Sequence, residues 1–471
     1  MKIDSHIGGQ SVPLDAGRYM DRHDPRTGAK LLETAIGGAQ EVDQAVHAAE
    51  AALDAWRDMR PSLRGRILLD VARAVRGSTD RIGALEQSET GKPGREMPVL
   101  MDLVAQYFEY YAGLVNVDDG QVINVGPDYH VYTRRDPFGV IGVILPWNAP
   151  LHQAARAIAP ALAAGNTVVA KPSEFTSASM VEFAKLAEEN GLPPGVLNVV
   201  LGTGPEVGAA MGRHPGISKI SFTGSVRAGR ELGRIAADRL LPLTLELGGK
   251  SANIVFADAD LAAAAKGSAF GFTWNSGQWC AAGTRILVQR EILEIFTEQL
   301  VTAVQALDIG PHDSATSGPI TTEVQYRKIL EYFDIARAEG ARALTGGIAL
   351  PGPGAFVPAT LYTDVTNDMR IAREEVFGPV AVIIPFDDEA EAVRIANDSE
   401  YGLAAGIWSR DIGRVHRVAR RLDAGRIVVN EYGGGFVQTP CGGFKSSGYG
   451  REQGLEALAH YTQTKSVIIR L

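Results

Sequence analysis

Residues 138–170 read FGVIGVILPWNAPLHQAARAIAPALAAGNTVVA, and this stretch indicates the fold class. Two short apolar runs, 139–145 and 167–170, flank a segment that predicts a helix ending near Leu162. Gly165 stands where that helix should stop, because glycine readily adopts the left-handed backbone that closes many helices. An apolar strand, a helix and a second apolar strand together predict a mostly parallel sheet covered by helices.

The same alternation continues along the chain in two series. The first series predicts strands at 196–200, 217–222 and 243–247, with helices at 177–189 and near 226–238. The second predicts strands near 252–256, 285–288, 380–385, 404–408 and 426–430, with helices that include 292–307 and 326–339. Because one hydrophobic core rarely grows beyond roughly 250–300 residues, a chain of 471 residues favours two α/β domains.

The remaining segments predict helices before the first sheet and two isolated strands. Helical spacing of apolar residues indicates helices at 41–56 and 98–114, and Ser62 is a candidate N-cap for another. Aromatic residues crowd the 98–114 helix and favour a place in the core. Residues 129–135 alternate like a strand and 466–471 form a terminal strand, so both could add to another sheet.

The composition argues against several classes of protein. Hydrophobic residues make up 45% and charged residues 21%, and the net charge of −9 comes without a basic stripe for nucleic acid. Two cysteines are too few for a disulfide framework or a zinc site, so we expect no metal and a reducing, cytoplasmic location. The longest apolar run is far below the roughly 20 residues that span a bilayer, so no membrane association is expected.

Two residues suited to acyl chemistry stand in glycine-rich turns. Cys280, in NSGQWCAAG, is a candidate nucleophile, because a thiolate is the most nucleophilic side chain near neutral pH. The alternative is a small buried hydrophobic residue, which we favour for Cys441. Glu246, in LTLELGGK, is either a base whose pKa burial would raise or an ion-pair partner of Lys250.

Three further turns carry polar groups. Asn148 could stabilise an oxyanion through its amide or simply form the turn. Lys171 and Glu174 could bind adjacent ribose hydroxyls or form a surface salt bridge. Gly224 and Ser225 stand between a strand and a helix, where backbone N–H groups can receive phosphate, although the pattern G-x-G-x-x-G is absent. Because ligands bind beyond the carboxyl ends of strands in open α/β sheets, all these turns are expected to converge.

Taken in order, these segments resemble the aldehyde dehydrogenase superfamily across nearly the whole chain. Each motif is modest alone, but seven in series are highly specific. The matching strings are PWN (146–148), KPSE (171–174), FTGS (222–225), ELGGK (246–250), GQWC (277–280), EEVFGP (374–379) and PCGGFKSSG (440–448).

The resemblance implies three structural parts. A Rossmann-type NAD(P)-binding domain would comprise 1–117 and 138–247, and a second α/β domain, the catalytic domain, would comprise 248–445. A small β oligomerisation element would comprise 118–137 and 446–471. Because exposed strand edges favour pairing between subunits, a homodimer or homotetramer is expected.

The resemblance also implies the NAD(P)-dependent oxidation of an aldehyde to a carboxylic acid. Cys280 would attack the aldehyde carbon, and the Asn148 amide and the Cys280 backbone N–H would stabilise the oxyanion. Glu246 would activate the water that hydrolyses the thioester. Lys171 is assigned to this catalytic group and, with Glu174, to the adenosine ribose.

Further contacts with the cofactor are implied by the same resemblance. They are Gly224 and Ser225 with the pyrophosphate, Glu375 with the nicotinamide ribose, and Trp147 and Phe377 beside the ring. A carboxylate at Glu174 accepts a hydrogen bond from a 2′-hydroxyl but repels a 2′-phosphate. NAD is therefore expected in preference to NADP.

Three positions bear on the substrate, which the sequence does not identify. Trp279 is larger than the residue that many relatives carry there, and it either narrows the substrate tunnel or points into the core. Arg156 lines the substrate mouth in the family and could pair with a semialdehyde carboxylate, serve an aromatic aldehyde, or be solvated. Cys441 replaces an aromatic residue and indicates a more open floor.

Other functions remain open at this point. A CoA-acylating semialdehyde dehydrogenase would share the fold and the nucleophile, but it would not need Glu246 as a hydrolytic base. A non-enzymatic binding or structural relative would be expected to have lost Cys280 or Glu246. A thiol redox sensor would need Cys280 and Cys441 close enough to bridge, with Cα atoms within about 7 Å.

Overall fold

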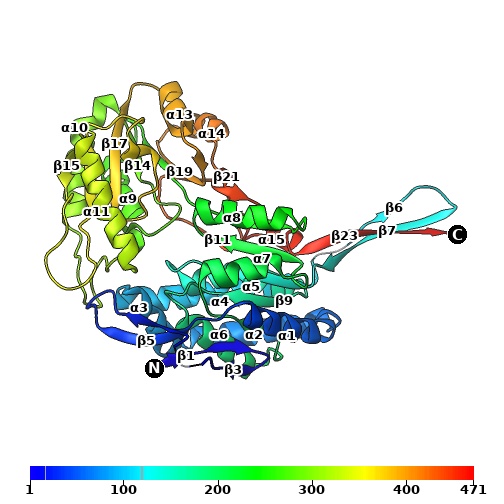
Figure 1. The fold of residues 1–471 in the computed structure, drawn as a ribbon. Helices are drawn as coiled ribbons and strands as arrows, with labels where there is room; N and C mark the ends of the chain where they lie inside the picture. The colour runs from blue at the N-terminus through cyan, green and yellow to red at the C-terminus, as the bar shows by residue number, and fades with distance from the viewer. Residues whose placement is uncertain (16, 118–119) are drawn as a thin grey trace.

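Two large sheets organise the chain in the computed structural model, which describes residues 1–15, 17–117 and 120–471 (Figure 1). Helices cover both faces of each sheet, so the predicted α/β fold class is confirmed. The predicted strands and helices of both series are present, with small shifts at their ends.

The first sheet has eight strands, in the order β22 (Gly448–Tyr449), β12 (Leu243–Glu246), β11 (Lys219–Thr223), β8 (Val140–Ile144), β9 (Thr167–Lys171), β10 (Leu197–Val199), β2 (Ser5–Ile7) and β3 (Gln10–Val12). The five strands from β12 to β10 are parallel. Strand β9 follows on one side of β8 and β11 on the other. This reversal opens a crevice at the carboxyl end of β8, where ligands bind in such sheets.

Helices cover both faces of this sheet because its strands are apolar on both sides. Ile141 and Val143 face one core, and Val140 and Ile144 face the other. The first core includes α2 (Pro61–Arg76), α4 (Met97–Gly113), α5 (Pro150–Ala163) and α6 (Ala178–Glu189). The second includes α1 (Ala39–Arg57), α7 (Ala209–Arg213) and α8 (Val226–Ala237).

The N-terminal region differs from its predicted pattern in two respects. The N-cap of α2 is Arg60 and not Ser62, because Pro61 has no N–H to satisfy and starts the helix as its first residue. Short strands also precede α1: in addition to β2 and β3, they are β1 (Lys2–Ile3), β4 (Tyr19–His23) and β5 (Lys30–Ala35). Strands of two to six residues carry too little periodicity to be recognised in a sequence.

The second sheet has seven strands, in the order β15 (Arg342–Thr345), β16 (Thr360–Thr363), β17 (Val380–Phe386), β14 (Arg285–Gln289), β13 (Ala252–Val255), β19 (Ala404–Trp408) and β20 (Arg426–Val429). All neighbours are parallel except β15 and β16. One face packs on α9 (Leu261–Thr273) and α10 (Leu293–Gln305). The other packs on α11 (Glu323–Ala338), α13 (Glu389–Asn397) and α14 (Ile412–Arg421).

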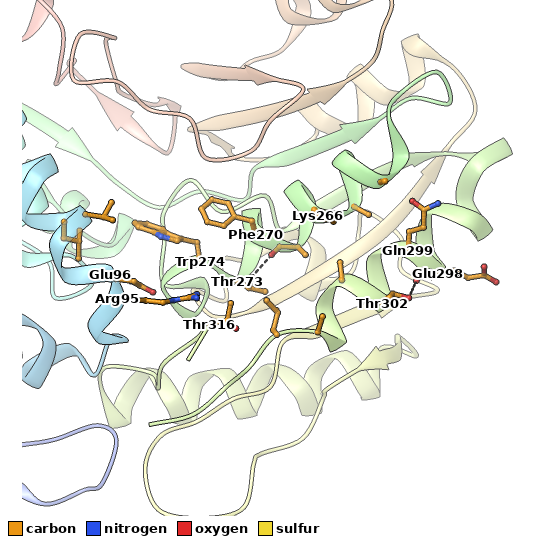
Figure 2. A pocket seen from close by; sticks show the side chains of 18 of the residues that line it. Arg95, Glu96, Lys266, Phe270, Thr273, Trp274, Glu298, Gln299, Thr302 and Thr316 are labelled. Atoms are coloured by element: carbon orange, nitrogen blue, oxygen red, sulfur yellow. Dashed lines mark hydrogen bonds between the residues drawn. The ribbon is translucent and has the colours of Figure 1, made fainter. Parts of the chain in front are cut away.

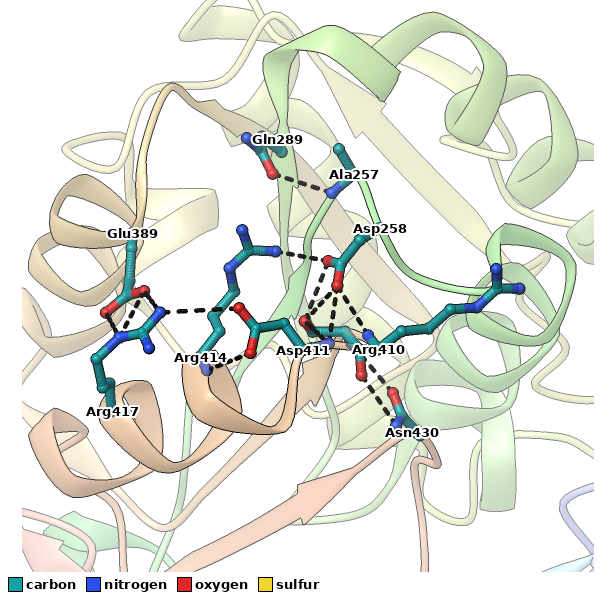
Figure 3. A network of polar contacts seen from close by, with 10 residues as sticks. Ala257, Asp258, Gln289, Glu389, Arg410, Asp411, Arg414, Arg417 and Asn430 are labelled. Atoms are coloured by element: carbon teal, nitrogen blue, oxygen red, sulfur yellow. Dashed lines mark hydrogen bonds and ion pairs between the residues drawn. The ribbon is translucent and has the colours of Figure 1, made fainter.

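A polar network fixes the carboxyl ends of β13 and β19 to the start of α14 (Figure 3). The Asp258 carboxylate accepts hydrogen bonds from the Ser409 hydroxyl, from the backbone N–H groups of Arg410 and Asp411, and from the Arg414 side chain. Asp411 in turn caps α14 by accepting a hydrogen bond from the Arg414 N–H. These contacts satisfy donors that the first turn of a helix leaves free.

A third sheet projects from the body as a long arm (Figure 1). It contains β6 (Val122–Ile123), β7 (Tyr129–Pro137) and β23 (Thr462–Arg470), all antiparallel. This is the expected small β element, although residues 118 and 119, where it was predicted to begin, lie outside the described residues. The predicted domain boundaries stay a prediction. No helix in the described part of the chain has the length and apolar character that crossing a membrane requires.

Candidate active site

Most of the predicted site residues gather where the carboxyl ends of the first sheet meet the amino ends of the second. Asn148 follows β8 and Glu246 ends β12, as expected. Cys280 instead precedes β14, and Glu375 precedes β17. The expectation that every reactive turn follows a strand is therefore wrong for Cys280, because the second sheet directs its amino ends to the site.

Two cavities reach Cys280. One has a volume of about 150 Å³ and is lined by most of the predicted cofactor contacts, namely Trp147, Gly224, Ser225, Glu375 and Phe377. The other, of about 230 Å³, is lined by the predicted substrate residues Arg156 and Trp279. Asn148, Gln153, Glu246 and Cys280 line both. A thiol, a carboxylate and two amides thus stand where the two spaces meet.

The loop before Cys280 has an uncommon backbone. Asn275, Ser276 and Gly277 have φ angles of 52°, 55° and 69°. A Cβ at Gly277 would lie 2.1 Å from the carbonyl carbon of Gly378, so only glycine fits there. The Ser276 hydroxyl donates to the Gly318 carbonyl at 2.8 Å and helps to hold this geometry. Left-handed conformations of non-glycine residues cost about 1–3 kcal/mol each and are often found at active sites.

Asn148 is held from both sides. Its backbone carbonyl oxygen accepts hydrogen bonds from Lys92 Nζ at 2.7 Å and from Asn275 Nδ2 at 2.9 Å. Its own Nδ2 donates to the Gln278 carbonyl at 2.9 Å, which ties it to the nucleophile loop. An amide nitrogen carries two hydrogens, so one remains to stabilise an oxyanion formed at Cys280.

Glu246 lies buried, with 3% of its surface exposed, and its Oε1 has no hydrogen-bond partner among the described residues. Burial raises the pKa of Glu246 well above its usual range; Arg156 opposes this shift and Glu452 adds to it. No ion pair with Lys250 is present among the described residues, so that alternative is wrong. A free carboxylate oxygen with a raised pKa suits a general base.

The surroundings of the Cys280 thiol favour its protonated form. Burial raises its pKa to about 12, and the positive charge of Arg156 opposes this shift. Attack on a substrate therefore requires a group that accepts the thiol proton. Cys441 is buried and lines the same substrate-side cavity, and both cysteines are free.

The cavity of about 150 Å³, the cofactor-side cavity, combines aromatic rings with a carboxylate and glycine backbone. The Trp147 and Phe377 rings meet edge to face, with centroids 5.4 Å apart. The Glu375 carboxylate accepts a hydrogen bond from the Gly249 N–H at 3.0 Å, and a Cβ at Gly248 would lie 2.3 Å from Glu375 Oε2. An aromatic wall beside a carboxylate and glycine backbone can accommodate a ring and a ribose.

The helix α8 begins at the edge of this cavity. The Ser225 hydroxyl caps it by accepting a hydrogen bond from the Ala228 N–H at 3.2 Å, and Gly224 stands just before it. Backbone N–H groups at the first turn of a helix favour an anion. This end of the cofactor-side cavity therefore suits a pyrophosphate.

The substrate-side cavity is rich in aromatic side chains. Trp279 meets Trp274 and Tyr432 edge to face, with centroids 5.3 Å and 6.0 Å away, and it lines the cavity while doing so. Arg156 is only 4% exposed and forms an ion pair with Glu452, so the solvated alternative is wrong. Among the described residues, no group of three or more His, Cys, Asp or Glu could hold a metal ion.

Comparison with known proteins identifies the family. The family model described as "Aldehyde dehydrogenase family" matches residues 12–467. The chain belongs to the aldehyde dehydrogenase family. Solved structures agree: a proposed aldehyde dehydrogenase from Burkholderia cenocepacia is 40% identical, with a TM-score of 0.97 over 100% of this chain and 97% of that one.

Two further aldehyde dehydrogenase structures are similar. An NAD-dependent enzyme from Sinorhizobium meliloti is 38% identical, with a TM-score of 0.98 over 100% of this chain and 95% of that chain. The NAD+ complex of an enzyme from Bacillus cereus is also 38% identical, with a TM-score of 0.98 over 100% and 97%. The predicted family and fold class are thus confirmed.

Lys171 and Glu174 lie apart from the other predicted site residues of this aldehyde dehydrogenase. Lys171 ends β9, and its Nζ donates to Glu174 Oε2 at 3.1 Å and to the Pro172 carbonyl at 3.0 Å. Lys171 and Glu174 thus form the ion pair named as the alternative, with Lys171 itself only 2% exposed, and burial lowers the pKa of Lys171. Neither residue lines the two cavities at Cys280. The ribose role of both residues and the catalytic role of Lys171 stay predictions.

Sequence reasoning missed the buried ion pair that supports Asn148 in this aldehyde dehydrogenase. Lys92 Nζ contacts Glu86 Oε1 at 3.3 Å, and both side chains are almost fully buried. Glu86 Oε2 also accepts a hydrogen bond from the Leu151 N–H at the start of α5. A lysine after a glycine at a helix end was the only signal, and by itself it does not indicate an active site.

Proposed function

We propose that this aldehyde dehydrogenase oxidises an aldehyde to the carboxylic acid with NAD, through a thioester on Cys280. The observation that carries the proposal is that Cys280, Glu246 and Asn148 line the same two cavities, with Glu246 Oε1 buried and free. A CoA-acylating enzyme would not need that buried carboxylate. A non-enzymatic relative would need none of the three.

The chemistry assigned to the chain has two halves. In the first, the Cys280 thiol gives its proton to Glu246 and its sulfur bonds to the aldehyde carbon, while the Asn148 amide and the Cys280 N–H stabilise the oxyanion. NAD, when bound, supplies the acceptor for the hydride. Glu246 releases that proton to solvent before the second half. In the second, Glu246 takes a proton from water, the water oxygen bonds to the acyl carbon, and the carbon–sulfur bond breaks as the leaving sulfur takes the proton back from Glu246. Aldehyde, NAD+ and water thus give carboxylate, NADH and two protons in total.

The residues of the cofactor-side cavity fit NAD. Trp147 and Phe377 would flank the nicotinamide, Glu375 would bind its ribose, and Gly224 and Ser225 would meet the pyrophosphate at the start of α8. Two similar proteins, the Sinorhizobium meliloti enzyme and the Bacillus cereus complex, are described with NAD. Glu174 would favour NAD over NADP because its carboxylate repels a 2′-phosphate.

We further propose that the chain forms a homodimer or homotetramer through its arm. Val122 and Ile468 on this third sheet are 76% and 68% exposed, and Leu471, which directly follows β23, is 79% exposed. Exposed apolar side chains on an open strand edge favour pairing with another chain. The cytoplasmic location stays a prediction.

NADH formation by the purified protein tests the proposed function. Straight-chain, aromatic, hydroxy and carboxylate-bearing aldehydes would be supplied with NAD or NADP, each with and without CoA. We expect turnover with NAD that does not require CoA and that Cys280→Ala abolishes while NAD binding persists. Turnover that depends on CoA would contradict the hydrolytic step, and turnover by Cys280→Ala would contradict the nucleophile.

A further inference from the structure

A large apolar groove adjoins the substrate-side cavity. It has a volume of about 970 Å³ and lies between the first half of α4 and the helices α9 and α10. Figure 2 shows Phe270 and Trp274 toward one end of the groove and Gln299 and Thr302 toward the other. Small or aliphatic side chains make up much of its lining: Val99, Leu100, Ala265, Ala269, Ala303 and Leu307.

The groove and the substrate-side cavity share a wall. Leu103, Phe270 and Trp274 line both spaces. Trp274 also contacts Trp279, the residue before Cys280, with ring centroids 5.3 Å apart. A substrate tail that passes these shared side chains would reach the groove.

The chemistry of this path favours an apolar chain without a carboxylate. In the groove, Val99 is 71% exposed and Phe270 is 45% exposed, so a ligand that covers them gains hydrophobic free energy. In the substrate-side cavity, the charge of Arg156 is already neutralised by the buried carboxylate of Glu452. Arg156 therefore offers little to a carboxylate on the substrate.

We propose that this groove holds the tail of the substrate, and that the preferred substrates are aldehydes with a long unbranched alkyl chain. The aldehyde carbon lies at Cys280 and the chain passes Trp274 into the groove. This proposal rests on the proposed function of the site. Each methylene that reaches the groove should raise kcat/KM about three- to fourfold, the value expected for burying one CH2 group.

A series of straight-chain aldehydes tests the proposal. We would measure kcat/KM with NAD for propanal, hexanal and decanal in the wild type, in Val99→Asp and in Ala303→Trp. Val99→Asp places a charge against the alkyl chain of the substrate, and Ala303→Trp fills part of the groove. Each should lower the ratio of decanal to propanal kcat/KM by about tenfold. Ile412→Asp is the matched control, because Ile412 is 66% exposed in the first turn of α14 and lines neither space; its ratio should not change.

The outcomes separate this proposal from the proposed function. If propanal is oxidised but the wild-type series is flat, the groove holds no substrate tail, while the proposed function stands. If the series is flat and Val99→Asp alters the oligomeric state measured by light scattering, the groove is covered by a second copy of the chain. If no aldehyde is oxidised, both proposals are wrong.

Discussion

Substitutions in the buried Lys92–Glu86 ion pair test how Asn148, the proposed oxyanion donor, is positioned. Lys92→Met removes the charged donor to the Asn148 carbonyl and leaves Glu86 buried without its partner; the two side chains are 4% and 0% exposed. Breaking a buried ion pair from one side costs about 3–5 kcal/mol of stability. The Asn148 carbonyl keeps its hydrogen bond from Asn275, so positioning is only partly lost. If this partial loss of positioning removes about 1.4 kcal/mol of transition-state stabilisation, kcat falls about tenfold.

A second variant separates positioning from stability. In Glu86→Gln/Lys92→Met neither charge of the pair remains, and the glutamine oxygen can still accept the hydrogen bond from the Leu151 N–H. We expect this variant to recover much of the unfolding free energy, measured by denaturant titration, without recovering kcat. Lys185→Met is the control, because Lys185 forms only an exposed ion pair with Glu182. Recovery of kcat together with stability would refute the positioning role, as would an unchanged kcat in Lys92→Met.

Three other variants test the site. Because Glu246 takes the thiol proton and later activates water, Glu246→Gln should slow both the NADH burst and the steady state by roughly 10²–10⁴-fold, and an unchanged burst would contradict the thiol role. Because burial raises the pKa of Glu246, the wild-type deacylation rate should rise with pH as the carboxylate ionises. Glu174→Gln should raise the NADP-to-NAD ratio of kcat/KM about tenfold, and an unchanged ratio would contradict the role of its charge. Gly277→Ala should abolish turnover and alkylation of Cys280, because its Cβ would meet Gly378, whereas Gly113→Ala, whose Cβ meets nothing within 4 Å, should behave as the wild type.

Local sequence patterns predicted those parts of the fold that depend on neighbouring residues. Strands such as β8 and β9 are apolar on both faces, so their burial can be recognised without knowing their partners. Short strands such as β2 and β3 were missed, because β2 pairs with β10, far along the chain, and β3 joins the sheet only through β2. The start of α2 was misplaced because a proline in the first turn outweighed the serine beside it.

The convergence of the candidate site residues could be predicted from the sequence, but the residues that support them could not. Cys280, Glu246 and Asn148 were identified through motifs, and the structure brings them to the same cavities. The pairs Lys92–Glu86 and Arg156–Glu452 were not predicted. Arg156 and Glu452 come from distant segments, and nothing local to either residue indicates its partner. The second sheet directs the amino ends of its strands to the site, whereas the first sheet directs its carboxyl ends there. This difference was missed for the same reason.

The electrostatics of the site order the two halves of the proposed reaction. Burial raises the pKa of both Cys280 and Glu246, and the negative charge of Glu246 further raises that of the thiol. Arg156 lowers both, but Glu452 already neutralises much of its charge. The site therefore supports one negative charge more readily than two, held either by the sulfur or by the carboxylate. Glu246 takes the thiol proton when the sulfur attacks, and it must release that proton before it can activate water. A proton path from Glu246 to solvent is thus required between acylation and deacylation.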